Sequence, residues 1–217
     1  MQTENQVCFI IGAGEFNRSY CMPREGDFVI AADAGYLTLK KHGIIPNMII
    51  GDMDSIEEAG VSFQNVIAPE YPIEVCKLPA EKDDTDMLAA IRKGLEKGYR
   101  NFAILGATGG RIDHTIANIQ CLTFLSKQGC RACLYGRDSE LQVVTNGSIS
   151  FPAIQAGMIA VFSMGDAAKG VCLTGLKYPL ENAIITNEFP IGVSNEFIGN
   201  PSSITVKEGS LLIIRYL

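Results

Sequence analysis

The chain has 217 residues, of which 47% are apolar and 19% charged, so it can bury a sizeable core and does not have a disordered composition. A net charge of −6 argues against nucleic-acid binding through the phosphate backbone. No apolar run reaches the roughly 20 residues of a membrane-spanning helix, and the polar, acidic start does not resemble a secretion signal. Seven scattered cysteines, mostly in apolar runs, favour reduced thiols and a cytoplasmic protein.

Up to about residue 136, apolar strand-like runs alternate with helical patterns. We expect strands at 7–11, 28–32, 48–50, 102–105 and 131–135, and helices at 36–42, 84–97 and from about 111 to 127. Asp83 and Asp84 suit the N-terminal cap of the second helix. Strands that alternate with helices predict parallel β-α-β units. Residues 1–136 are therefore expected to form an α/β domain with a mostly parallel, Rossmann-like sheet.

After residue 136 the pattern changes to short β-type runs separated by Gly, Asn and Pro turns. The runs lie at 141–145, 148–151, 158–163, 184–186, 203–206 and 211–216. This spacing predicts an all-β sandwich or barrel over residues 137–217. So small a β domain is expected to pack on the first domain or on another subunit.

The loop after the first strand contains Gly12 and Gly14, and Asp33 follows at the end of the next strand. This arrangement imitates a dinucleotide-binding fingerprint, in which a distant acid takes a ribose hydroxyl. Asn17 stands where the third glycine is expected, so a tight strand-to-helix turn explains the loop equally well. A dinucleotide oxidoreductase remains one alternative.

Two acidic motifs follow. Asp52 and Asp54 come directly after a strand, and alternation in an extended segment would point both to the same side. Lys82-Asp-Asp-Thr-Asp86 has more acids than a helix cap requires. Crowded carboxylates repel unless a cation lies between them, and hard oxygen ligands favour Mg²⁺. Asp52, Asp54 and Asp86 are thus candidate ligands of one magnesium ion, although a solvated turn and a cap would also account for these acids.

Gly106-Ala-Thr-Gly-Gly-Arg-Ile-Asp-His114 joins a strand to a helix through a glycine-rich turn. Backbone N–H groups of such a turn form a cradle for anions. Arg111 is suited to clamp phosphate, Asp113 to cap, bind a metal-bound water or hold a hydroxyl, and His114 is a weaker candidate. Together the acidic and glycine-rich loops predict phosphoryl transfer at one edge of the sheet.

The chain resembles the thiamine pyrophosphokinases over nearly its whole length. Six motifs carry the resemblance: Ala31-Ala-Asp-Ala-Gly35, Gly51-Asp-Met-Asp-Ser55, Asp83-Asp-Thr-Asp86, Gly109-Gly-Arg-Ile-Asp-His114, Thr174-Gly-Leu-Lys-Tyr178 and Gly192-Val-Ser-Asn195. The resemblance implies transfer of pyrophosphate from ATP to the thiamine hydroxyl, with magnesium. It also implies a C-terminal β-sandwich and a homodimer, in which thiamine binds where two subunits meet.

The family motifs, together with the loops described above, give each site residue an expected role. Asp52, Asp54, Asp86 and Asp113 are expected to be catalytic, the first three of them also as magnesium ligands. Tyr178, Ser194 and Asn195 are expected to bind thiamine. The expected ATP-binding residues are Gly12, Asn17, Asp33, Lys82, Thr108, Gly110 and Arg111. Ala34 departs from the family's usual glycine, which a negative φ would permit.

Two further alternatives stay open. One is a pyrophosphokinase that acts on another hydroxymethyl heterocycle, such as a pterin. The other is a non-catalytic regulator that binds a nucleotide or thiamine. The expected partners are ATP, thiamine and a second copy of the chain, with neither nucleic acid nor a membrane.

Overall fold

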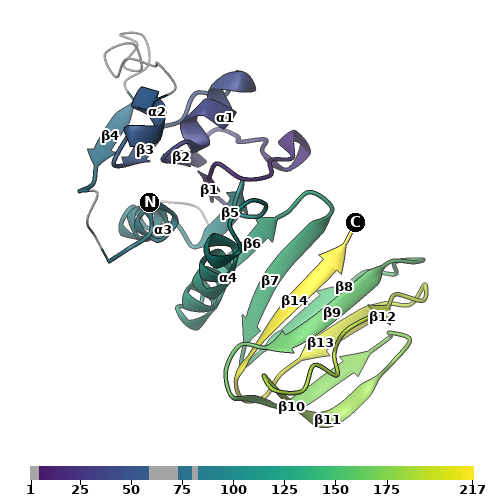
Figure 1. The fold of residues 1–217 in the computed structure, drawn as a ribbon. Helices are drawn as coiled ribbons and strands as arrows, with labels where there is room; N and C mark the ends of the chain where they lie inside the picture. Colours follow the sequence, from purple (N-terminus) through teal and green to yellow (C-terminus); the bar gives the residue numbers. More distant parts are fainter. Residues whose placement is uncertain (1–4, 59–72, 80–82) are drawn as a thin grey trace. The chain divides into compact units, whose positions relative to one another are not determined.

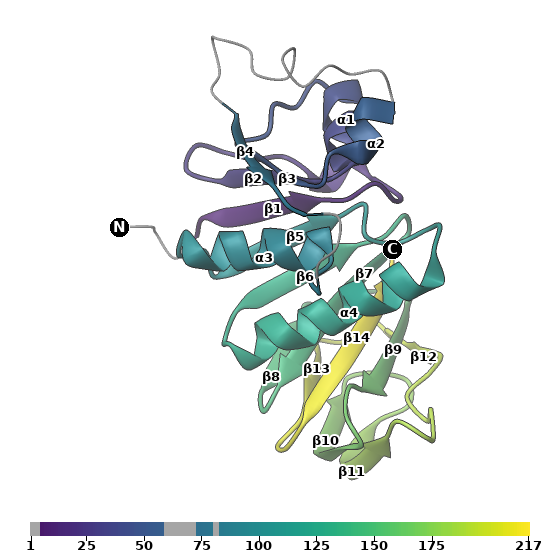
Figure 2. The same cartoon turned by 60° about the vertical axis from the view of Figure 1, so that its left-hand side comes forward.

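The computed structural model describes residues 5–58, 73–79 and 83–217. The chain folds into two compact units, one of residues 1–118 with 134–137, the other of 119–133 with 138–217. It combines a mixed sheet and helices with a separate antiparallel sheet, as expected in coarse outline (Figures 1 and 2). The domain boundary after residue 136 stays a prediction.

The first unit contains strands β5, β1, β2, β3 and β4 in this order, with the end of β6 next to β5. Each of the pairs β5–β1, β1–β2, β2–β3 and β3–β4 is parallel, so these strands end at one edge of the sheet. Their bounds are β1 Val7–Ile11, β2 Phe28–Ala32, β3 Met48–Gly51, β4 Glu74–Lys77, β5 Asn101–Leu105 and β6 Arg131–Tyr135.

Helices cover both faces of this sheet, with α1 (Gly35–Lys41) and α3 (Asp86–Glu96) on opposite sides (Figure 1). Alternate strand residues such as Phe9 and Ile11 share a core with Leu39 of α1, because successive side chains point to opposite faces. On the other face, a Cβ added to Gly94 of α3 would lie 2.9 Å from the Cys8 sulfur. The other helices of the described residues are η1 (Arg18–Tyr20), α2 (Asp54–Glu58) and α4 (Ile112–Lys127).

The starts of α1 and α3 show how the sequence sets the backbone locally. Ala34 has a φ of −60°, as required for it to replace the family's glycine. The expected acidic cap of α3 is wrong: the Thr85 side chain accepts a hydrogen bond from the Leu88 backbone N–H at 3.2 Å. A hydroxyl at this position satisfies an otherwise free helix N–H, which leaves Asp86 as the first helical residue.

The second unit contains two antiparallel strand sets, β12-β9-β14-β7 and β11-β10-β13-β8. Their inward side chains, such as Val161 and Leu211 from one set and Val171 and Ile204 from the other, form a common core. The bounds are β7 Ser139–Thr145, β8 Ser148–Phe151, β9 Met158–Ser163, β10 Ala167–Thr174, β11 Leu180–Thr186, β12 Asn195–Glu196, β13 Ser202–Thr205 and β14 Ser210–Tyr216.

Strands β4 and β10 and the two-residue strand β12 were not predicted from the sequence. Strand β10 contains Gly170 at a φ of +62°, and its register with β11 shifts around this residue, which interrupts the alternating pattern.

All seven cysteines are free thiols, and burial raises the pKa of Cys8 to about 12. Within the described residues, no helix is long and apolar enough to span a membrane.

Candidate active site

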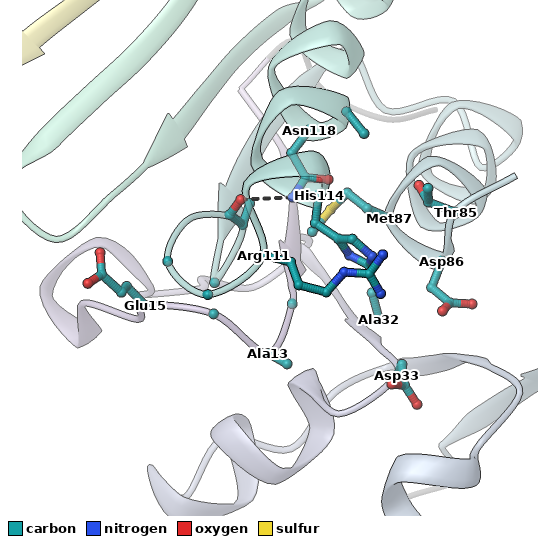
Figure 3. Close-up of a pocket in the computed structure, with 17 residues that line it drawn as sticks. Ala13, Glu15, Ala32, Asp33, Thr85, Asp86, Met87, Arg111, His114 and Asn118 are labelled. Carbon is teal, nitrogen blue, oxygen red and sulfur yellow. Dashed lines mark hydrogen bonds between the residues drawn. The ribbon is translucent and has the colours of Figure 1, made fainter.

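A cavity of about 470 Å³ opens in the first unit, at the edge where the parallel strands end (Figure 3). Its walls come from the loops that follow β1, β2 and β5, from the start of α3 and from the first turns of α4. Five of the expected site residues line it: Gly12, Asp33, Asp86, Gly110 and Arg111.

Two glycine-containing loops pack backbone against backbone at this cavity. The Gly14 N–H donates to the Gly106 carbonyl and the Glu15 N–H to the Thr108 carbonyl, both at 2.8 Å, and the Gly106 N–H returns a bond to Glu15. A Cβ on Gly14 would lie only 2.2 Å from the Thr108 carbonyl oxygen, so glycine is required by this close approach. Backbone packing thus explains these glycines without a dinucleotide fingerprint.

Thr108 lies in the same loop but is not among the described residues that line the cavity. Its hydroxyl oxygen is buried and has no hydrogen-bond partner within the described part of the chain. Leaving a buried hydroxyl unsatisfied is unfavourable, and this one lies in the glycine-rich loop for which the sequence predicts anion binding.

Arg111 contributes a positive charge to the described wall of the cavity. Its guanidinium donates two hydrogen bonds to Asp113, at 3.1 and 2.5 Å. The hydrogen bond from Arg111 lowers the pKa of Asp113 to about 2. Asp113 itself does not line the cavity, whereas His114 does, and Figure 3 shows Arg111 and His114 pointing toward the side where Asp86 lies.

Asn118, which the sequence analysis did not select, also lines the cavity. Its side chain is buried, and its amide donates to the Ala107 carbonyl at 2.8 Å (Figure 3). The signal was present in the spacing, because Arg111, His114 and Asn118 recur at three- and four-residue intervals around α4.

Asp33 and Asp86 bring two carboxyl groups to the cavity (Figure 3). Asp33 has a φ of +45°, an uncommon conformation for a residue other than glycine, and its N–H donates to the Ile50 carbonyl at 2.8 Å. This bond ties the end of β2 to the end of β3, which precedes Asp52 and Asp54.

Asp52 and Asp54 do not lie on an extended segment, so that expectation is wrong. The buried Met53 between them has a φ of +74°, and Asp54 begins α2. The Asp52 carboxylate instead accepts a bond from the Asp54 N–H at 3.2 Å, as an Asx turn does. Neither residue is among those described as lining the cavity, although Gly51 approaches Asp33 so closely that a Cβ would lie 3.1 Å from the Asp33 Cα.

The carboxylates of Asp33 and Asp86 are oxygen donors of the kind that binds magnesium. Across residues 5–58, 73–79 and 83–217, no three His, Cys, Asp or Glu side chains gather as a preformed metal site. Mg²⁺, however, is commonly held by one or two carboxylates together with substrate phosphates. Asp33 and Asp86 place carboxylates in a cavity that Arg111 also lines, and this suits a metal bound together with a phosphate chain.

Two further expected nucleotide-binding residues, Asn17 and Lys82, are not found in the described lining of the cavity. The Asn17 side chain caps η1 by accepting a bond from the Ser19 N–H at 3.1 Å, and Asn17 does not appear in the described lining. Lys82 falls outside the described residues.

The expected thiamine-binding residues come together in the second unit. Asn195 is buried and exchanges hydrogen bonds with the backbone of Tyr178, at 2.7 and 2.9 Å. The Tyr178 side chain is exposed, with the Lys177 ammonium 5.4 Å from its ring centroid. Ser194, next to Asn195, is exposed and has a φ of +59°.

Two family profiles match the chain. The profile described as "Thiamin pyrophosphokinase, catalytic domain" matches residues 22–134, and the one described as "Thiamin pyrophosphokinase, vitamin B1 binding domain" matches residues 148–211. The first match contains all the described cavity-lining residues except those at 12–15, and the second contains Tyr178 and Asn195.

Individual relatives agree over most of the chain. Thiamine pyrophosphokinase of Bacillus subtilis (strain 168) is 33% identical over 187 residues, which is 86% of each chain. The crystal structure of thiamine pyrophosphokinase from Bacillus subtilis superposes with a TM-score of 0.84 at 29% identity and covers 97% of this chain and 99% of its own. The structure from Geobacillus thermodenitrificans gives a TM-score of 0.84 at 28% identity, with 98% of each chain covered. The chain therefore belongs to the thiamin pyrophosphokinase family.

Proposed function

We propose that this chain transfers the pyrophosphoryl group of ATP to the hydroxyl of thiamine, giving thiamine diphosphate and AMP. The observation that carries the proposal is the cavity of the first unit, which is lined by two hydrogen-bonded glycine loops, by Arg111 and by two carboxylates. The catalytic-domain profile of the family matches this part of the chain. Backbone N–H groups and a guanidinium are the groups that bind phosphate oxygens best.

In this proposal the first domain, residues 1–136, is Rossmann-like and binds ATP along its strand ends. The phosphates lie against the loop of residues 106–111, where the unsatisfied Thr108 hydroxyl supplies a donor. The hydrogen bonds from Arg111 to Asp113 fix the guanidinium in position for the phosphates. The proposed nucleotide-binding residues are Gly12, Asn17, Asp33, Lys82, Thr108, Gly110 and Arg111.

Asp86, which lines the cavity beside Asp33, would hold magnesium together with Asp52 and Asp54, which follow β3 outside the described lining. Bound magnesium would neutralise phosphate charge. The thiamine hydroxyl attacks the β-phosphorus in line with the departing AMP, and one carboxylate, Asp54 or Asp86, takes the hydroxyl proton. Positioning of the two substrates accounts for most of the acceleration, because phosphoryl transfer needs little covalent help from the protein.

Residues 137–217 form the proposed β-sandwich that binds thiamine, through Tyr178, Ser194 and Asn195. An aromatic ring face attracts a cation such as thiazolium. We further propose that the protein is a cytoplasmic homodimer and that thiamine lies where two subunits meet. The exposed apolar side chains Phe189, Ile191 and Val193, just before Ser194, support an intersubunit surface in this region.

The deciding experiment incubates the protein with ATP and thiamine, with and without Mg²⁺, and separates the nucleotides produced. AMP and thiamine diphosphate in equal amounts, abolished by a chelator, are expected. ADP as the product, or product formation untouched by the chelator, contradicts the proposal. A hydroxymethylpterin offered in place of thiamine tests the nearest rival, and binding without turnover would indicate a regulator.

Asp54→Asn tests the carboxylate role in the same assay. We expect turnover to fall by about 100-fold or more, since a general base alone contributes roughly 10²–10⁴-fold. The side chain is exposed, so the thermal midpoint should stay unchanged. Near-normal activity would remove Asp54 from the mechanism.

A further inference from the structure

The second unit holds an exposed aromatic ring on a fixed backbone. The Tyr178 side chain is 56% exposed, although the residues before it are firmly held. Leu176 and Phe197 form a β-bridge between buried residues, and the Lys177 N–H donates to the Glu196 carbonyl at 3.0 Å. An exposed ring at the end of such an anchored segment is a feature of binding surfaces rather than of a core.

Asn195 continues this ladder by one step with its side chain. Its amide nitrogen donates to the Tyr178 carbonyl at 2.7 Å, and its amide oxygen accepts the Tyr178 N–H at 2.9 Å. Two residues of an antiparallel pair exchange the same two bonds through their peptide groups. The Asn195 amide therefore replaces a peptide group opposite Tyr178 and sets the backbone of that residue from both sides.

The hydrogen-bonding capacity of Asn195 is largely used in this role. Its amide oxygen also accepts the Glu196 N–H at 2.9 Å, which occupies both lone pairs. The residue is only 5% exposed. A substrate that accepted or donated hydrogen bonds there would have to displace bonds within the protein.

We infer that the part of Asn195 in thiamine binding, proposed above, is indirect: it is a positioning residue, which acts by fixing Tyr178 rather than by touching thiamine. The inference rests on the proposed function and assigns the direct contact to the Tyr178 ring. The Lys177 ammonium already lies over this ring, tied to Glu196 at 2.7 Å, so the ring face accepts a cation in the protein itself. A cationic heterocycle is the ligand that such a face suits.

Losing Asn195 should affect one substrate only. The backbone of Tyr178 would lose two hydrogen bonds, and its ring would sample other orientations. Binding of thiamine would then cost more conformational entropy, because the ring must be fixed at that moment. The KM for thiamine should rise while the KM for ATP stays the same. A general loss of structure would change both constants and the turnover number together.

A double-mutant cycle with Asn195→Ala and Tyr178→Ala shows whether Asn195 acts through the Tyr178 ring or by direct contact with thiamine. Each single variant should raise the KM for thiamine by about 10-fold, or about 1.4 kcal/mol. In the Tyr178→Ala background, Asn195→Ala should add less than about 2-fold. Independent effects that multiply, or an Asn195→Ala variant with an unchanged KM for thiamine, would overturn the inference.

Controls keep the test decisive. Ser202→Ala removes another buried side-chain oxygen of the same unit, one without a hydrogen-bond partner in the described structure, and should leave both KM values unchanged. If Asn195→Ala does not fold, Asn195→Asp takes its place in the cycle, because it keeps the acceptor oxygen and loses the donation to the Tyr178 carbonyl. A wild-type protein that makes no AMP and thiamine diphosphate contradicts the proposed function, whereas an active wild type with multiplicative effects contradicts only the role of Asn195.

Discussion

Two places in the molecule join segments that are distant in sequence, and they do so by different means. In the first unit, the loops at Gly14 and Gly106 exchange backbone hydrogen bonds at a distance that leaves no space for a Cβ. In the second unit, one amide side chain, that of Asn195, spans the gap to the Tyr178 backbone. The comparison shows that the same local rigidity can rest on the absence of side chains or on the presence of one.

The two solutions have different consequences for substitution. Backbone contact makes the glycine loops part of the fold, so an added methyl group must displace the main chain. A side-chain bridge can be removed by truncation without steric conflict, and only the bridged residue is released. Substitutions in the first place should therefore damage stability as well as binding, and those in the second should alter binding selectively.

Gly14→Ala should produce the largest effect. Its Cβ would lie 2.2 Å from the Thr108 carbonyl oxygen, and overpacking of this kind costs about 1–3 kcal/mol, with more where backbone must move. We expect a lower free energy of unfolding in denaturant titrations and a loss of ATP binding. Gly165→Ala is the matched control, because nothing lies within 4 Å of its added Cβ. Equal stability of the two variants would contradict the backbone-contact explanation.

Asn118→Ala tests a side-chain bridge within the first unit and should have a smaller effect. It removes the 2.8 Å bond to the Ala107 carbonyl, and the loss of a buried partner costs about 1–3 kcal/mol. Because Ala107 and Asn118 both line the cavity, the KM for ATP should rise while the KM for thiamine does not.

Ser126→Ala is the control on the same helix. Ser126 bonds to Thr145 at 2.9 Å and does not line the cavity among the described residues, so its loss should affect stability alone. If both α4 variants raise the KM for ATP alike, the bond from Asn118 to the loop has no special role.

Regular elements were predictable from the sequence because burial imposes a pattern on them. The apolar runs at 7–11, 28–32 and 131–135 coincide with β1, β2 and β6, and the amphipathic stripe over 84–97 contains α3. The glycine-rich and acidic loops were also recognisable, since their composition differs from that of ordinary turns. The sequence thus identified the edge of the sheet at which the cavity forms.

What could not be predicted depends on single backbone angles and long-range contacts. The left-handed conformation of Met53 re-aims its two acidic neighbours, and no local preference of methionine indicates it. Asn118 is an ordinary polar helix residue until the loop at Ala107 is placed beside it. Likewise, Asn195 and Tyr178 are 17 residues apart, and the two bonds between them exist only once the second unit has folded.

The Arg111–Asp113 ion pair is a third kind of side-chain bridge, and its removal should have the smallest effect on stability. Both side chains are exposed, so the bridge involves no buried group. Arg111 holds the pKa of Asp113 at about 2, below the ordinary value of 3.8. A depressed carboxyl pKa stabilises the folded state above pH 3.8, and this contribution is lost as the pH falls toward 2. Asp113 should therefore stay ionised and paired from pH 5 to 9, and activity in this range should show no step from its titration.

A carbon NMR titration of the Asp113 carboxyl should show its pKa returning toward 3.8 in Arg111→Gln. Arg137→Gln, which alters the guanidinium near Glu15 instead, should leave this pKa where it was, and an Asp113 that titrates alike in both variants would show that Arg111 does not hold it.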